Sequence, residues 1–267
     1  MNNKISKIAE WISEQGYPLE MYCENILSLN NFSVMQSLHY EDEETKKYRE
    51  IDLLATRYFT LNGVTFNFSI VVECKLSRDK PWLLFSRRQH MDHKEEIIKD
   101  IFTTINGKLL MTKTNELNNL SLLNYDSDKI GFNLTQCFTS GKDIPYQAIM
   151  STVNACEYLV NKSNTSKRPF CNFYFPVIVI DSEMYNCRTG LGEDLEIRSI
   201  EIGKLLSVRS YSDRPSILYT IVTKTGFKAF VENLSNEFTE LFKNLTPAFQ
   251  YVSDTRPSNP SPDYSFL

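Results

Sequence analysis

The chain has 267 residues, 42% of them hydrophobic and 23% charged, a composition typical of a globular protein that buries a sizeable core. It has no apolar run near the roughly 20 residues that span a bilayer and no signal-peptide core, so we expect a cytoplasmic protein without membrane contact. The net charge of −4 argues against a protein that coats long stretches of nucleic acid, because such proteins are usually basic.

Six cysteines are spread along the chain without a Cys-x-x-Cys pair. This spacing favours reduced thiols over a disulfide framework or a zinc site. The cysteines are Cys23, Cys74, Cys137, Cys156, Cys171 and Cys187.

The first part of the chain changes from helical to strand periodicity near residue 30. Residues 3–15 predict an amphipathic helix that stops at Gly16, and a second helix begins at Pro18 with an apolar stripe along one side. Alternating apolar residues then predict an antiparallel meander. Its strands are expected at residues 32–40, 48–59 and 64–76, with a turn at residues 61–63.

The rest of the chain alternates helical and strand patterns around an irregular middle. The expected elements are a mostly helical stretch at residues 86–110, a loop-rich insertion at about 112–144, a helix at 145–161, a buried strand at 173–180, strands at 200–211 and 216–223, and a helix at 227–245. Pro176 suggests that the buried strand lies at an edge or carries a bulge.

The order α-β-β-β-α-β with a later βα extension predicts the α/β class, with one mixed sheet sandwiched by helices. We expect a single domain at residues 1–250, with its core at about 16–182. The Pro/Ser-rich tail at 251–267 is expected to be disordered.

Two strands of the meander carry charged residues where apolar residues are expected. On the third strand, Glu73 and Lys75 share one face at the end of an almost wholly apolar run. On the second strand, Asp52 interrupts a run that otherwise belongs to the core. If the turn pairs these strands, Asp52 comes alongside Glu73. Charges in such places are costly to desolvate unless they are paired or bind a metal.

Two carboxylates on adjacent strands suit a hard divalent cation such as Mg²⁺, which prefers oxygen ligands and keeps several waters. Lys75 beside that cation could position or deprotonate a water for attack on a phosphodiester. A structural alternative is a buried ion pair between Lys75 and either Asp52 or Glu73.

This arrangement resembles the PD-(D/E)XK nuclease superfamily, which has the restriction-endonuclease-like fold. The likeness is carried by Ile51-Asp52, by Glu73-Cys74-Lys75 and by a preceding helix that bears Glu20. It covers residues 16–75 and extends more loosely to residue 180; the proline of the family's first motif is absent. The resemblance implies that Mg²⁺, with Mn²⁺ as a substitute, is held by Asp52, Glu73 and the backbone carbonyl of Cys74, and that Lys75 positions water or stabilises charge.

The resemblance also implies a metal-binding glutamate on the second helix. Glu20 follows Leu19 as in the family's helix opening, and Glu24 lies one turn later on the same side. We favour Glu20 and keep Glu24 as the alternative. The expected catalytic set is then Asp52, Glu73, Lys75 and Glu20.

Basic residues flank both candidate strands, where they could grip phosphates or simply lie on solvated loops. The candidates for substrate binding are Lys47, Arg49, Arg78, Lys80, Arg87 and Arg88, together with Trp82. Trp82 could stack on a base, although an aromatic residue after a proline more often closes the edge of the core. His90 and His93 have the spacing of zinc ligands on a helix, but a polar helix face is the simpler interpretation.

The resemblance therefore predicts a Mg-dependent endonuclease, a hydrolase that cuts phosphodiester bonds in DNA, in restriction, repair or defence. Its partner would be nucleic acid, and the chain could also act as a homodimer or with a partner subunit. Two alternatives stay open. One is a catalytically inactive nucleic-acid- or protein-binding module of the same fold, which the acidic net charge favours; the other is an RNA-directed nuclease.

Overall fold

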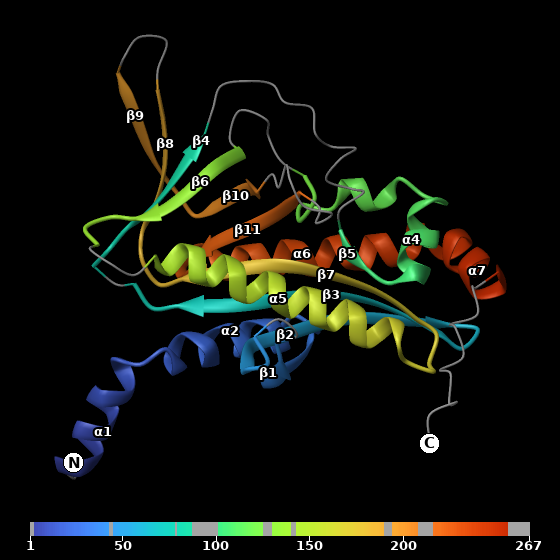
Figure 1. Ribbon diagram of the computed structural model, residues 1–267, viewed down its shortest axis with the longest axis horizontal. Coiled ribbons are helices and arrows are strands. Elements are labelled where there is room, and N and C mark those ends of the chain that lie inside the picture. Colours follow the sequence, from blue (N-terminus) through green and yellow to red (C-terminus); the bar gives the residue numbers. More distant parts are fainter. Residues whose placement is uncertain are drawn as a thin grey trace.

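A mixed β-sheet runs through the protein and carries helices on both faces (Figure 1). The computed structural model describes residues 3–42, 45–77, 79–86, 101–124, 130–139, 143–189, 194–207 and 216–255. In these ranges the strands are β1 (Ser33–Glu41), β2 (Tyr48–Leu61), β3 (Val64–Lys75), β4 (Trp82–Ser86), β5 (Phe102–Thr103), β6 (Ile130–Gln136), β7 (Phe170–Ile180), β8 (Met184–Thr189), β9 (Leu195–Ile200), β10 (Ile202–Ser207) and β11 (Ile217–Thr223). They lie in the order β1-β2-β3-β7-β11-β10-β6-β4-β8-β9, with β5 also paired to β7.

The helices form the outer layers of the fold. They are α1 (Asn3–Ser13), α2 (Tyr17–Leu29), α4 (Ile105–Met111), the 3₁₀ helix η1 (Glu116–Asn119), α5 (Ile144–Asn164), α6 (Lys224–Asn244) and α7 (Thr246–Thr255). Side chains of α2, α6 and α7 share one hydrophobic core with one face of the sheet, and α5 packs in a second core on the other face. The predicted α/β class, one mixed sheet between helices, is confirmed.

The predicted antiparallel meander is present at the N-terminal edge of the sheet. β1 pairs with β2 and β2 pairs with β3, both antiparallel, and the second pairing starts at Leu61↔Val64. The turn uses Asn62 at φ 49° and Gly63 at φ 77°. Two consecutive residues with positive φ match the twist of the flanking strands, which is why Asn-Gly is favoured in such turns. The meander therefore sets the register of the strands that carry the charged residues.

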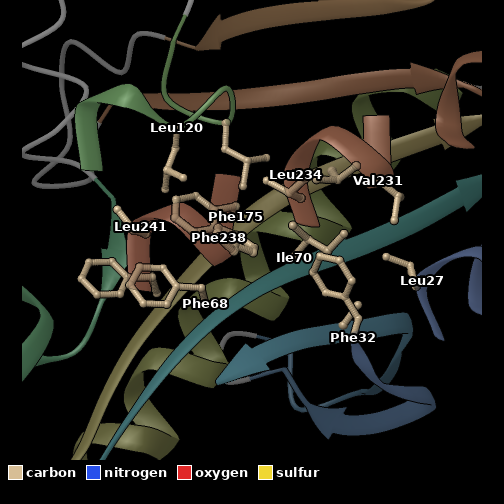
Figure 2. Close-up of a cluster of buried hydrophobic side chains, with 14 of the residues drawn as sticks. Leu27, Phe32, Phe68, Ile70, Leu120, Phe175, Val231, Leu234, Phe238 and Leu241 are labelled. Carbon is tan, nitrogen blue, oxygen red and sulfur yellow. The ribbon is translucent and has the colours of Figure 1, made fainter. Parts of the chain in front are cut away.

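The larger core lies between β3, β7 and α6 (Figure 2). The rings of Phe68 on β3 and Phe173 on β7 stack with centroids 4.9 Å apart, and Phe238 of α6 packs on Phe68 at 5.6 Å. α6 contributes its buried side chains at helical spacing, from Val231 through Leu234 to Phe238. This packing fixes β3, and with it the end of the strand where Glu73 and Lys75 lie.

Pro176 is in the interior of the sheet, so the expected edge or bulge position is wrong. β7 pairs in parallel with β3 along its whole length. On its other side, β5 pairs with Phe173 and Tyr174, and β11 starts to pair at Val177. Pro176 falls between these two partners, so its missing N–H interrupts neither pairing.

Several short strands differ from the sequence-based expectation. β6 lies within the expected loop-rich insertion at 112–144, and β4, β8 and β9 were not predicted. Their runs are five to seven residues long and mix polar with apolar side chains, so their period is ambiguous in the sequence. β5 also replaces part of the helical stretch expected at 86–110; α4 is helical, and residues 87–100 lie outside the described residues.

The first five residues of the expected disordered tail, 251–255, are helical. α7 continues to Thr255 and buries Phe249 and Val252 against the larger core. The remaining residues of the expected tail, 256–267, lie outside the described residues.

Candidate active site

Three carboxylates and one lysine come together where β2 and β3 meet α2. Pairing of Leu53 with Val72 brings Asp52 next to Glu73. The charges of Glu73, Glu20 and Lys75 all act on Asp52, and those of Glu73 and Lys75 act on Glu20. The structure thus brings together the four side chains that the sequence predicted as one catalytic set.

Asp52 occupies an irregular point of β2. The β1–β2 register is constant, but the pair Ser37↔Asp52 is missing between Gln36↔Leu53 and Leu38↔Ile51, and Ser37 has φ 51°. Ile51 and Leu53 belong to different cores, although alternate residues of a regular strand share a face. The Asp52 carboxylate accepts a 2.7 Å hydrogen bond from the Cys74 backbone N–H. Asp52 therefore replaces a backbone acceptor at the point where the strands separate.

Glu73 is held at both carboxylate oxygens. Lys75 donates to Oε1, and the hydroxyl of Ser151 on α5 donates to Oε2 at 2.7 Å. Glu73 is only 6% exposed. Burial with two donors keeps this carboxylate in one orientation on the face of the sheet that α5 covers.

The cluster carries more negative than positive charge. Burial raises the pKa of Asp52 to about 7, and the charge of Glu73 adds to this effect while the Cys74 N–H opposes it. Burial, followed by the charges of Glu50 and Glu73, also raises the pKa of Glu20. Burial alone would lower the pKa of Lys75, but the adjacent Glu73 reverses this and the pKa is raised. Lys75 therefore stays cationic, while Asp52 and Glu20 resist ionisation.

Of the two candidate glutamates on α2, Glu20 lies in the cluster. Its pKa responds to Glu73 and Lys75 across the sheet. Glu24 instead accepts a 2.7 Å hydrogen bond from Ser28 on its own helix. The geometry therefore agrees with the choice of Glu20.

Ser151 was not singled out from the sequence. It lies 78 residues beyond Glu73 on a different element, and only the packing of α5 against β3 brings the two together. A lone serine in a helix carries no sequence signal for such a contact. Sequence reasoning could have found it only after the fold was known.

The basic residues expected to bind substrate differ in their exposure and in their partners. Lys47 and Lys80 are exposed and available to a ligand. Arg49 donates to Asp42, which is 3% exposed and also accepts from Asn154 of α5. The Thr45 backbone N–H, and then Arg49, hold the pKa of Asp42 at about 2. Arg49 is thus engaged in closing the β1–β2 connection, and Arg78, Arg87, Arg88, His90 and His93 lie outside the described residues.

Trp82 is buried, so the candidate role in base stacking is wrong and the alternative, that it closes the edge of the core, is confirmed. Its side chain is 0% exposed, and its Nε1 donates to the Ser77 hydroxyl at 2.9 Å. Ser77 also accepts from Gln136, and its N–H donates to Asp181 at 2.7 Å. These contacts connect the residues after β3 to the start of β4, to the end of β6 and to the turn after β7. A large aromatic ring after a proline closes the core here, because its burial is favourable once the indole N–H has a partner.

A cavity of about 440 Å³ lies beside the first turns of α5. Met150, the neighbour of Ser151, lines it together with Tyr146, and Phe132 and Ser207 line it from the sheet. Tyr146 is 58% exposed. The cavity offers space for a ligand close to the helix that holds Glu73.

The donors of the cluster suit a hard cation bound by few protein ligands. Within the described residues, no three His, Cys, Asp or Glu side chains are placed to hold a metal ion together. Asp52 and Glu73 instead form a pair of carboxylates. The Cys74 carbonyl points to the same side of β3 as the N–H that Asp52 accepts from, since both groups of one strand residue face one neighbour. Two carboxylates and a carbonyl, completed by waters, match the ligands that Mg²⁺ takes.

No family model matches the chain, and neither does any curated protein or solved structure. Across the part of the chain that the structure describes, none of the helices is long and apolar enough to cross a membrane. Inference about function therefore depends on the residues and contacts of the cluster.

Proposed function

We propose that the protein is a cytoplasmic, metal-dependent endonuclease that hydrolyses phosphodiester bonds in DNA and has the restriction-endonuclease-like fold. The observation that supports it most is the convergence of Asp52, Glu73 and Lys75, with Glu20 beside them, on one end of the meander. The arrangement of α2, the three meander strands, α5 and the parallel strand β7 follows the αβββαβ order of that fold.

Asp52, Glu73 and the Cys74 carbonyl would hold Mg²⁺, or Mn²⁺ in its place, while Glu20 on α2 would act on the cation through its charge and not as a direct ligand. Bound there, the cation supplies charge stabilisation for the phosphodiester oxygens during an in-line displacement. The burial and mutual repulsion of Asp52 and Glu73 give the pair a strong preference for a compensating cation. Ser151 orients Glu73 from the α5 side.

Lys75 supplies the positive charge that the protein itself brings to the reaction. Its ammonium donates a hydrogen bond to Glu73 and stays protonated. From that place it can orient an attacking water or stabilise the developing charge on the phosphate. Lys75 acts on the attacking water or on the developing charge and does not bind the metal. Catalysis should therefore depend on Lys75 more than on any other residue of the cluster, and metal binding should not.

The acidic net charge of −4 restricts how the substrate is held. The chain cannot rely on general attraction to phosphates, so local contacts from residues such as Lys47 and Lys80 are needed beside the carboxylate cluster. DNA is the substrate that the resemblance implies. An RNA-directed nuclease and a non-cleaving binding module are alternative outcomes of the experiment below.

The first experiment asks whether the purified protein nicks supercoiled plasmid DNA. We expect nicking with Mg²⁺ or Mn²⁺ and none with a chelator. Two variants one turn apart on α2 provide a matched comparison: Glu20→Gln should lower the rate about 10-fold because it removes a carboxylate near the cation, whereas Glu24→Gln should cut like wild type. Cleavage of RNA but not of DNA would identify the RNA-directed alternative. If the protein cleaves no polynucleotide and calorimetry shows no Mn²⁺ binding, the non-cleaving binding module is the interpretation that fits.

The contact between Ser151 and Glu73 predicts a second effect. Ser151→Ala should raise the metal concentration needed for half-maximal cleavage about 10-fold, because loss of an outer hydrogen bond typically weakens metal binding by 10- to 100-fold. The rate at saturating metal should change little, and Ser151→Thr should restore the affinity. Gln147→Ala, an exposed position one turn earlier on α5, is the control. Equal metal dependence in Ser151→Ala and wild type would exclude a positioning role.

A further inference from the structure

β9 forms one edge of the sheet and carries exposed apolar side chains. In the part of the chain that the structure describes, β9 pairs with β8 alone and ends the strand order. The β8–β9 hairpin projects away from the helices (Figure 1). Leu195 and Ile197 lie on one face of β9, with exposed fractions of 60% and 56%. An edge whose outward backbone groups lie beside exposed apolar side chains favours the addition of a further strand.

β9 lacks the backbone features that protect many edge strands. Proteins discourage pairing at an edge with proline, with bulges or with charges that repel an added strand. β9 has no proline and no residue with positive φ, and its pairing with β8 is unbroken from Leu195 to Ile200. At the opposite edge, β1 has Ser37 at φ 51°, and the pair Ser37↔Asp52 is missing. Of these two edges, β9 is therefore the one that can accept a regular partner strand.

The charged residues of β9 fit a second copy of the same strand. Glu196 and Arg198 are two residues apart, so both project from the face opposite Ile197. A two-fold axis between two antiparallel strands of one sheet places one residue directly opposite its own copy. With Ile197 at the axis, Glu196 of each strand lies opposite Arg198 of the other. With Glu196 or Arg198 at the axis, that residue would face its own copy and like charges would repel, so the charges favour the register centred on Ile197.

We propose that β9 is a homodimerisation edge that pairs antiparallel with β9 of a second copy of the chain, in the register centred on Ile197. The two Ile197 side chains meet at the axis, which removes them from water. On the other face, Glu196 accepts a hydrogen bond from Arg188 of β8 at 2.8 Å, and Arg198 of the second copy lies on its other side. Arg198 contacts Glu196 of its own strand at 3.5 Å and its side chain remains 69% exposed, so it can reach across the new pairing. The interface is isologous and closes at two subunits.

The proposed interface is separate from the carboxylate cluster. That cluster lies at β2 and β3, near the other end of the strand order, so pairing through β9 does not include it. The inference concerns association only and holds whether or not the protein cuts nucleic acid.

The mass of the full chain, measured by analytical ultracentrifugation across the micromolar range, tests the edge. Wild type should approach twice the 31.0 kDa of one chain. Ile197→Lys should give monomers, because two lysines then face each other at the axis. Its circular dichroism spectrum should not change, since Ile197 is 56% exposed in the single chain. Met35→Lys, at a residue that is 50% exposed on β1 of the opposite edge, is the matched control and should dimerise like wild type.

Complementary charge reversals test the register. Arg198→Glu and Glu196→Lys should each weaken self-association at least about 10-fold, because like charges then face each other at two places. An equal mixture of the two variants should form heterodimers, since every pair across the interface is then of opposite charge. Three results would overturn the proposal: a wild-type mass of one chain throughout the range, an Ile197→Lys protein that dimerises like wild type, or a mixture of the folded charge variants no more associated than either alone.

Discussion

Lys75→Ala is expected to slow plasmid cleavage by about 10³-fold, the middle of the range found for a positioned acid–base or charge-stabilising group. Metal binding should not fall with it. In the metal-free protein Lys75 holds one oxygen of Glu73, so its removal frees a carboxylate oxygen for the cation. Calorimetry with Mn²⁺ should therefore show equal or tighter binding by a variant that hardly cuts.

That combination separates a role in the reaction from a role in structure. If the pair were only a buried ion pair, Lys75→Ala would leave Glu73 uncompensated and lower stability, and cleavage would fall only with the folded fraction. Lys228→Ala, an exposed lysine on α6 across the sheet, is the control for losing one positive charge. A Lys75→Ala protein that is folded and cuts within about threefold of wild type would contradict the assigned role.

The meander and the cluster were predictable because both depend on local patterns. Alternation places Glu73 and Lys75 on one face, and the Asn62-Gly63 turn fixes which residue of β2 lies opposite them. Local sequence was enough for the charged residues of β2 and β3, since a short turn joins those strands, whereas Glu20 of α2 was expected only from the family resemblance.

The features that the sequence did not predict depend on contacts between distant parts of the chain. Ser151 reaches Glu73 only through packing of α5, and Trp82 is buried because β4 joins β6 and β8 in the sheet. Arg49 is likewise engaged by Asp42, whose burial was not evident from the sequence. A charge or an aromatic ring near a candidate site looks the same in sequence whether it faces substrate or the interior.

Asp52→Asn is expected to stabilise the metal-free protein at pH 8, by about 2 kcal/mol or about 4–8 °C in melting temperature. Burial raises the pKa of Asp52 to about 7 from the ordinary 3.8, which would correspond to about 4 kcal/mol if fully expressed. Solvent screening of a part-buried group reduces this to about half. The asparagine oxygen can still accept from the Cys74 N–H, so the change removes charge and keeps the hydrogen bond.

The pH dependence gives this prediction its sign. Between about pH 4 and 7 the unfolded chain has released the Asp52 proton and the folded protein retains it, so the stability of wild type falls as the pH rises through this window. The advantage of Asp52→Asn should be small at pH 4.5, grow to pH 7 and then level off. Asp42→Asn is a control of opposite sign: the pKa of Asp42 is about 2 and its charge is stabilising, so that variant should melt below wild type at pH 8.

If these results are obtained, the ionised carboxylate of Asp52 lowers the stability of the folded protein. An acidic residue with a purely structural role would not be expected to do so. Mn²⁺ should cancel the difference by raising the melting temperature of wild type and not that of Asp52→Asn. If Asp52→Asn melts at or below wild type at pH 8 without metal, Asp52 is a satisfied structural acid. The cluster would then lose the electrostatic preference for a cation on which the proposed function depends.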